Sequence, residues 1–129
     1  MTTQETLEAL AKDYTAAWNS GDPNAVAGFY AEEGGIIINR GDPWQGRAKV
    51  AEMAAGFFAD VPDLRLRCDE IRGAGNHVIY VWTFTGHDAT SGRPLDVRGW
   101  EEWELDADLK VRQSYGWFDA EDYARQAGG

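Results

Sequence analysis

The most informative stretch of the chain reads YTAAWNSGD from Tyr14 to Asp22. Tyr14 and Trp18 are four residues apart, which places both aromatic side chains on one face of a helix. Ser20 and Gly21 end that helix, and Asp22 followed by proline is typical of the cap and first turn of another helix. The stretch therefore predicts an amphipathic helix, a tight turn and a second, short helix that continues to about residue 30.

Apolar residues upstream extend the same helix face toward the start of the chain. Leu7, Leu10 and Ala11 continue the steps of three and four residues that lead to Tyr14. Thr2 and Glu5 have the spacing of a capping box, so the first helix is expected to begin beside them.

The rest of the sequence changes from helical to strand periodicity. Ile36 to Ile38 is a β-branched run that predicts a short buried strand, and residues 47–59 carry the apolar face of a third helix. Asp119 is placed to cap a short terminal helix. Strands are expected over residues 64–68, 77–87, 95–105 and 110–118. This order predicts an α+β fold in which helices pack on one face of an antiparallel sheet.

Length and composition indicate one soluble globular domain over residues 1–129. Hydrophobic residues make up 43% of the chain and charged residues 26%, which are ordinary values for such a domain. No apolar run approaches the roughly 20 residues that a membrane span needs, and no secretory signal is recognised. Cys68 is the only cysteine, which excludes an internal disulfide and favours a cytoplasmic location.

The charge balance excludes two classes of partner. Twelve Lys and Arg face 22 Asp and Glu, so the formal net charge is −10. A chain this acidic repels phosphate backbones and anionic lipid, and we expect it to bind neither nucleic acid nor membranes. Six tryptophans, with five Tyr and five Phe, are unusual in so short a chain and indicate an aromatic core, pocket or interface.

The element order and the stretch from residue 14 to 22 resemble the nuclear transport factor two-like superfamily. Its small bacterial members include ketosteroid isomerase, limonene epoxide hydrolase and the SnoaL-like polyketide cyclases. Further matches are Phe29-Tyr30-Ala31, Gly46-Arg47 and Trp117-Phe118-Asp119. The resemblance implies a curved antiparallel sheet that the N-terminal helices wrap into a cone, a cystatin-like roll with an apolar cavity inside.

Tyr14 and Glu101 are the candidate catalytic residues. The resemblance aligns Tyr14 with an isomerase tyrosine that donates a hydrogen bond to the developing oxyanion. It aligns Glu101 with an aspartic acid that stays protonated beside that tyrosine, and an aromatic pocket would raise the pKa of such a carboxyl. Two alternatives stay open. Tyr14 could be a core residue bonded to a neighbour, and a shift of one residue would place Glu101 on the solvated face of its strand.

Two positions lack the carboxylates that the resemblance implies. Ile38 stands where the isomerase has its proton-abstracting aspartate, and Gly116 stands where the cyclases and the epoxide hydrolase have a carboxylate. Neither residue can carry a proton, which favours binding or a different chemistry. His77 and His87 lie at opposite ends of one strand without ligand-spaced partners, so no metal and no cofactor is expected.

Strand alternation separates the side chains that should line the cone from those that should lie outside it. The candidate ligand-binding residues are Trp18, Ile38, Phe57, Trp82, Phe84, Trp103 and Phe118. Trp100, Tyr115 and Trp117 should form an apolar patch on the opposite face, which we expect to be the interface of a homodimer. The alternative is that the terminal helix covers this patch.

Three functions fit the sequence. The first is acid–base isomerisation or cyclisation of a flat, apolar carbonyl compound. The second is non-catalytic binding of a hydrophobic metabolite in the same cavity. The third is a dimeric protein–protein adaptor, whose cavity would be filled by its own side chains. The expected partners are therefore a small hydrophobic molecule and a second copy of the chain.

Overall fold

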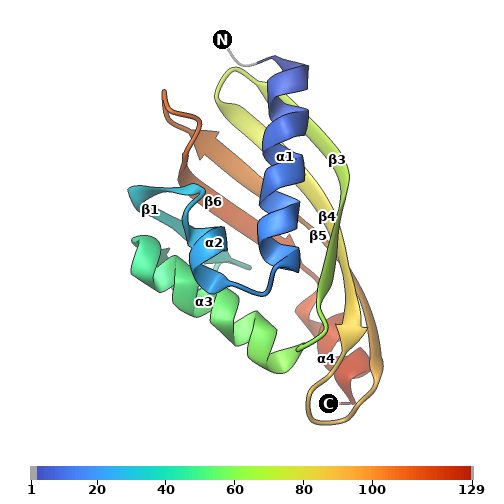
Figure 1. The fold of residues 1–129 in the computed structure, drawn as a ribbon. Helices are drawn as coiled ribbons and strands as arrows, with labels where there is room; N and C mark the ends of the chain where they lie inside the picture. Colours follow the sequence, from blue (N-terminus) through green and yellow to red (C-terminus); the bar gives the residue numbers. More distant parts are fainter. Residues whose placement is uncertain (1–2, 129) are drawn as a thin grey trace.

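The computed structural model describes residues 3–128, which form a six-stranded sheet with helices on one face (Figure 1). The helices are α1 (Gln4–Asn19), α2 (Pro23–Ala27), α3 (Arg47–Asp60) and α4 (Ala120–Ala127). The strands are β1 (Tyr30–Ile38), β2 (Trp44–Gln45), β3 (Arg65–Ala74), β4 (His77–His87), β5 (Pro94–Leu105) and β6 (Val111–Phe118).

The strands lie in the order β2-β1-β6-β5-β4-β3. The meander from β3 to β6 is antiparallel, as the sequence predicts. The expectation of a wholly antiparallel sheet is wrong at one pairing, because β1 runs parallel to β6. The chain leaves β1 through β2 and α3 and enters the sheet again at its opposite edge with β3. Only the last strand of the meander therefore reaches β1.

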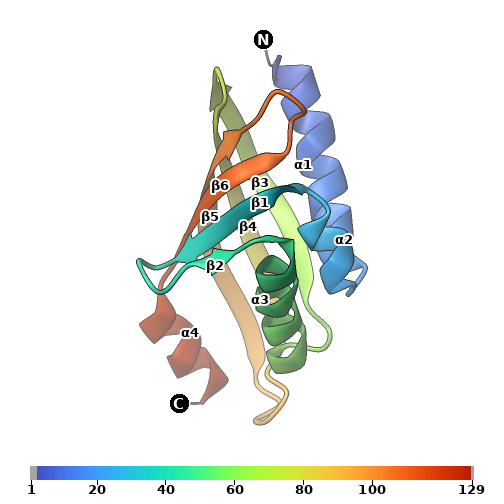
Figure 2. The same cartoon turned by 90° about the vertical axis from the view of Figure 1, so that its left-hand side faces the viewer.

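The first three helices cover one face of the sheet, and α4 packs at its lower end (Figure 2). Among residues 3–128, no helix lies across the other face. Side chains of β4 alternate between the two faces, so its large residues at even positions lie under the helices. These residues are Val78, Tyr80, Trp82 and Phe84, all at most 8% exposed. The predicted choice of inner face is confirmed.

The opening stretch of sequence ties α1 to the edge strand β3. The side chain of Asn19, at the end of α1, donates to the carbonyl of Leu66 at 3.0 Å and accepts from its N–H at 2.6 Å. Gly21 follows with a φ of +73°, a left-handed conformation that glycine adopts readily. At the other end Thr3 caps the helix by accepting from the N–H of Thr6, whereas the predicted capping residue Thr2 lies outside the described residues.

Several predicted element ends differ from the structure, and β3 in particular runs to Ala74, well beyond the predicted end at residue 68. Helix α2 ends at Ala27, and Tyr30 already begins β1, six residues before the predicted strand at Ile36. The register between β1 and β6 shifts between Tyr30 and Gly35, so the intervening Glu and Gly residues give no strand periodicity. Strand β2 was not predicted, because two residues are too few to show an alternation.

In the part of the chain that the structure describes, no helix is both long and apolar enough to cross a membrane. The cytoplasmic location stays a prediction.

Candidate functional site

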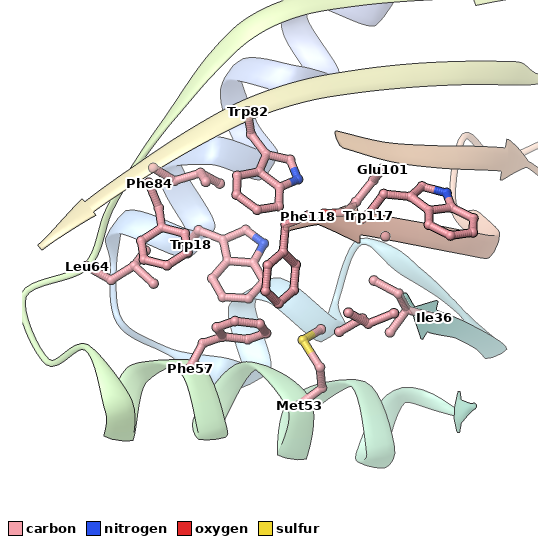
Figure 3. Close-up of a pocket in the computed structure, with 13 residues that line it drawn as sticks. Trp18, Ile36, Met53, Phe57, Leu64, Trp82, Phe84, Glu101, Trp117 and Phe118 are labelled. Carbon is pink, nitrogen blue, oxygen red and sulfur yellow. The ribbon is translucent and has the colours of Figure 1, made fainter. Parts of the chain in front are cut away.

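A pocket lies between the inner face of the sheet and helices α1 and α3 (Figure 3). The cavity has a volume of about 50 Å³, whereas one water needs about 10–15 Å³. Its aromatic lining residues are Trp18, Phe57, Trp82, Phe84, Trp117 and Phe118, and the ring of Trp117 is turned away from the other five, toward Trp100 (Figure 3). Its other lining residues are Ile36, Ile38, Met53, Leu64, Leu66, Glu101 and Gly116. The pocket has room for a small organic group.

Glu101 is the one titratable side chain among these lining residues. It lies on β5 with its side chain on the inner face, opposite Tyr80 of β4 and Gly116 of β6, and it is only 6% exposed. No Lys, Arg or His within residues 3–128 forms an ion pair with it. The sequence alternative of a solvated Glu101 is therefore not what the structure shows.

Four hydrogen-bond donors surround this carboxyl. One is a neighbour on β5, and the other three come from β6, α1 and β1. Trp103, two residues further along β5, donates its indole N–H to Oε1 at 2.9 Å, and Ser114 of β6 donates at 2.8 Å. The Tyr14 hydroxyl from α1 lies 3.2 Å from Oε1 and 3.0 Å from Oε2, and the Tyr30 hydroxyl from β1 lies 3.2 Å from Oε1. Oε1 thus meets all four donors, whereas Oε2 meets Tyr14 alone and keeps capacity for a proton or a ligand.

Burial and hydrogen bonding act on the pKa of Glu101 in opposite directions. Burial raises this pKa because the charged form loses water, and the four donors lower it because they favour the carboxylate. The net pKa is raised above the ordinary value for glutamic acid. Burial and the neighbouring Glu101 also raise the pKa of the Tyr14 and Tyr30 phenols, which therefore stay protonated as donors.

The raised pKa of Glu101 predicts how stability changes with pH. Between the ordinary pKa and the raised one, the folded state holds a proton that the unfolded chain releases, so the free energy of unfolding falls as pH rises through this window. We expect Glu101→Gln to lose this contribution. As pH rises, the free energy of unfolding of the variant should therefore increase relative to that of the unmutated protein. Urea titrations of both proteins from about pH 5 to about pH 8 measure this difference. Two parallel pH curves would contradict the prediction.

The structure brings the two predicted catalytic residues into direct contact, but it places them differently toward the pocket. Tyr14 is fully buried behind Glu101 and does not line the pocket, so its hydroxyl serves the carboxyl. Trp103 was predicted to bind ligand, yet it is also absent from the lining. Its ring stacks on Tyr80 with centroids 5.1 Å apart. The other six predicted ligand-binding residues do line the pocket.

Sequence reasoning missed two of the four donors. Tyr30 falls at the predicted end of the second helix, and Ser114 was given no role. Strand parity is the signal that could have found Ser114, because it lies opposite Trp103 on the neighbouring strand.

Ile38 and Gly116, the positions without the implied carboxylates, are neighbours in the sheet and both line the pocket. A Cβ at Gly116 would lie 3.5 Å from Ile36 and Ile38 and 4.0 Å from Glu101, in ordinary contact. This wall is therefore apolar and narrow, with Glu101 as its only acid. Residues 3–128 contain no group of three or more His, Cys, Asp or Glu side chains placed to hold a metal ion.

Solved structures share this fold at low sequence identity. A protein of ketosteroid isomerase-like fold from Catenulispora acidiphila, solved in complex with trimethylamine, has a TM-score of 0.85 and 19% identity over 99% of this chain and 95% of its own. TsrD from Streptomyces laurentii has a TM-score of 0.85 and 21% identity over 99% and 98% of the two chains. SalBIII, an epoxide hydrolase/cyclase-like enzyme connected with pyran ring formation in salinomycin, has a TM-score of 0.81 and 14% identity over 95% and 97%.

These identities are low enough that the likeness establishes the fold alone. No curated protein matches the chain at a significant level. A sequence model of the SnoaL-like domain, however, matches residues 11–113, which include the second half of α1, the whole of β1 and the strand that carries Glu101. The chain therefore belongs to the SnoaL-like family, within the nuclear transport factor two-like superfamily.

Proposed function

We propose that this protein binds a small, apolar carbonyl compound in the pocket and that Glu101 moves a proton on it. The observation that carries the proposal is the position of Glu101, the one acid of an otherwise apolar lining, with Oε2 left short of partners. An aromatic wall excludes water, which strengthens the carboxylate as a base toward a carbon acid. The cyclase-like enzyme among the similar structures supports this class of chemistry.

The proposed step needs only one carboxyl. Oε2 of the ionised Glu101 takes a proton from the carbon next to the carbonyl, that C–H bond breaks, and its electron pair forms the C=C bond of an enolate. Glu101 then either returns this proton to a conjugated carbon, which completes an isomerisation, or exchanges it with solvent before the enolate carbon takes up a proton again, which completes a hydrogen exchange. The four hydrogen-bond donors hold the carboxyl in place throughout and are positioning residues. They are Tyr14, Tyr30, Trp103 and Ser114.

Hydrogen exchange in a simple ketone tests this proposal. 2-Tetralone, a flat bicyclic ketone, is incubated with the protein in D₂O, and NMR follows the loss of the proton signals beside its carbonyl. The proposal expects exchange that is faster than in buffer and saturates with ketone concentration. Ketone that binds without enhanced exchange favours the second function, and ketone that does not bind overturns the proposal.

The second function, non-catalytic binding, is supported by the apolar wall at Ile38 and Gly116. A protein that only holds its ligand has no need of a base at those positions. The third function, an adaptor, expects a cavity filled by the protein's own side chains. The open space beside Glu101 favours the two small-molecule functions over it.

We also propose that a second copy of the chain covers the outer face of the sheet. Ile79, Trp100 and Tyr115 are exposed there by 48, 43 and 38%, and the Trp100 and Trp117 rings lie 6.4 Å apart. Helix α4 leaves Trp100 and Tyr115 exposed because it packs at the end of the sheet, where Tyr123 contacts Phe84. A face this aromatic suits two sheets packed back to back.

A charge in this face should separate the two copies. Sedimentation at micromolar concentration is expected to show a dimer for the unmutated protein and a monomer for Trp117→Arg, because the new charge would lose water opposite its own symmetry mate. Gly56→Arg is the control, since Gly56 is exposed on α3 with open space around it. The proposal is wrong if the unmutated protein is a monomer, or if the dimer persists in Trp117→Arg.

A further inference from the structure

Trp18 brings an unpaired hydrogen-bond donor to the pocket. The residue is only 7% exposed and lines the pocket, and its indole Nε1 is buried without a hydrogen-bond partner. Figure 3 shows this nitrogen on the side of the ring that faces the pocket. Buried donors in folded proteins nearly always have a partner, so an unpaired one that faces a pocket points to a missing acceptor.

The Tyr14 hydroxyl does not supply that acceptor. The Trp18 nitrogen lies close enough to it to oppose the rise in the pKa of the Tyr14 phenol. The pair nevertheless does not meet hydrogen-bond geometry, so the Trp18 N–H is left without a partner while the Tyr14 hydroxyl donates to Glu101. The Trp18 N–H and the carboxyl of Glu101 therefore belong to the same end of the pocket.

We infer that the indole N–H of Trp18 donates a hydrogen bond to the carbonyl oxygen of the bound ligand. This inference rests on the proposed function and adds the ligand group that the pocket selects. It reassigns to Trp18 the contact that the sequence resemblance gives to Tyr14. The two residues are one helical turn apart on α1, so both side chains leave the same helix face, and Trp18 lines the pocket whereas Tyr14 does not.

The ring of Trp18 is held in place for this role. Its centroid lies 6.0 Å from that of Phe57 and 5.4 Å from that of Phe58, both in edge contact from α3. A donor fixed by packing gives up little conformational freedom when a ligand arrives. Because the donor needs an oxygen or nitrogen lone pair, the pocket should prefer a ketone to a hydrocarbon of the same shape, and a protonated amine offers no such acceptor.

Indole NMR signals test the inference directly. The six tryptophans give six indole N–H resonances, and the one missing in Trp18→Phe belongs to Trp18. On titration of the unmutated protein with 2-tetralone, we expect the Trp18 resonance to move downfield, as it does when an N–H gains a hydrogen bond. Tetralin has the same rings without the carbonyl, so it should not move the Trp18 resonance downfield.

Affinities provide a second readout. The ratio of affinity for 2-tetralone to that for tetralin should fall by about fivefold to tenfold in Trp18→Phe, the loss expected for one neutral hydrogen bond. It should stay unchanged in Trp44→Phe, the same substitution on β2 outside the pocket.

The outcomes separate this inference from the proposed function. A ketone that binds with no Trp18 shift and an unchanged ratio in Trp18→Phe overturns the inference alone. If neither 2-tetralone nor tetralin binds, the proposed function and the inference fall together. If tetramethylammonium displaces the ketone and moves the Trp18 resonance in the same way, a hydrogen bond is not the cause and the inference is wrong.

Discussion

Glu101→Gln is expected to slow the exchange of 2-tetralone protons by about 100-fold or more, the usual contribution of a general base. The amide keeps the shape of the side chain, and its oxygen can still accept from Trp103 and Ser114. It cannot take up a proton, however, so the proposed transfer has no acceptor. The measurement is the initial rate of deuteration under saturating ketone, with binding followed separately by tryptophan fluorescence.

The control for this prediction is Glu104→Gln, the same chemical change on the same strand. Glu104 lies on the outer face of β5, near His77 and Arg112, and does not line the pocket. Its exchange rate should match that of the unmutated protein. A Glu101→Gln protein that binds the ketone and exchanges it at the original rate would show that the carboxyl is not the base.

Trp82→Ala is expected to reduce the free energy of unfolding by about 3–5 kcal/mol, as large aromatic-to-alanine changes in cores do. The Trp82 ring is 8% exposed and packs with Phe84 and Phe118 at centroid distances of 6.0 and 6.3 Å. It also lies so close to Gly99 that a Cβ there would come within 2.4 Å of a ring carbon. Urea unfolding followed by circular dichroism measures the change.

Thr85→Ala is the matched control on the same strand. Thr85 is exposed on the outer face of β4, so its loss should change the free energy of unfolding by less than about 0.5 kcal/mol. A Trp82→Ala effect as small as that of the control would mean that the ring contributes little to the core.

The alternation of side chains along the strands predicted more of the structure than any other sequence pattern. It placed Trp82 and Phe84 on the inner face, and it placed Trp100 and Tyr115 on the outer one, because a period of two leaves no other arrangement once one face is buried. The same rule, with the family resemblance, put Glu101 inside. Helix α1 could also be predicted from the sequence, since its apolar residues recur every three or four positions from Leu7 to Trp18.

The features that the sequence did not predict depend on distances between segments. The pairing of β1 with β6 joins residues about eighty positions apart and leaves no local pattern. The exact contacts of Glu101 depend on side-chain rotation as well as on the strand face, so Tyr30 could not be named as a donor. For the same reason Tyr14 and Trp103 were expected at the pocket, although both lie behind Glu101 and pack on each other with centroids 5.0 Å apart.

The parallel pairing of β1 with β6 also has a consequence for how the protein acquires its structure during synthesis. Strand β1 emerges from the ribosome early, but its main partner is the last strand of the sheet, and until then only the two residues of β2 can pair with it. The apolar stripe of α1 must likewise wait for β3 and β4. All strands through β6 have to be made before the sheet can close, so folding is expected to be slow for a domain of this size and exposed to aggregation before β1 finds its partner.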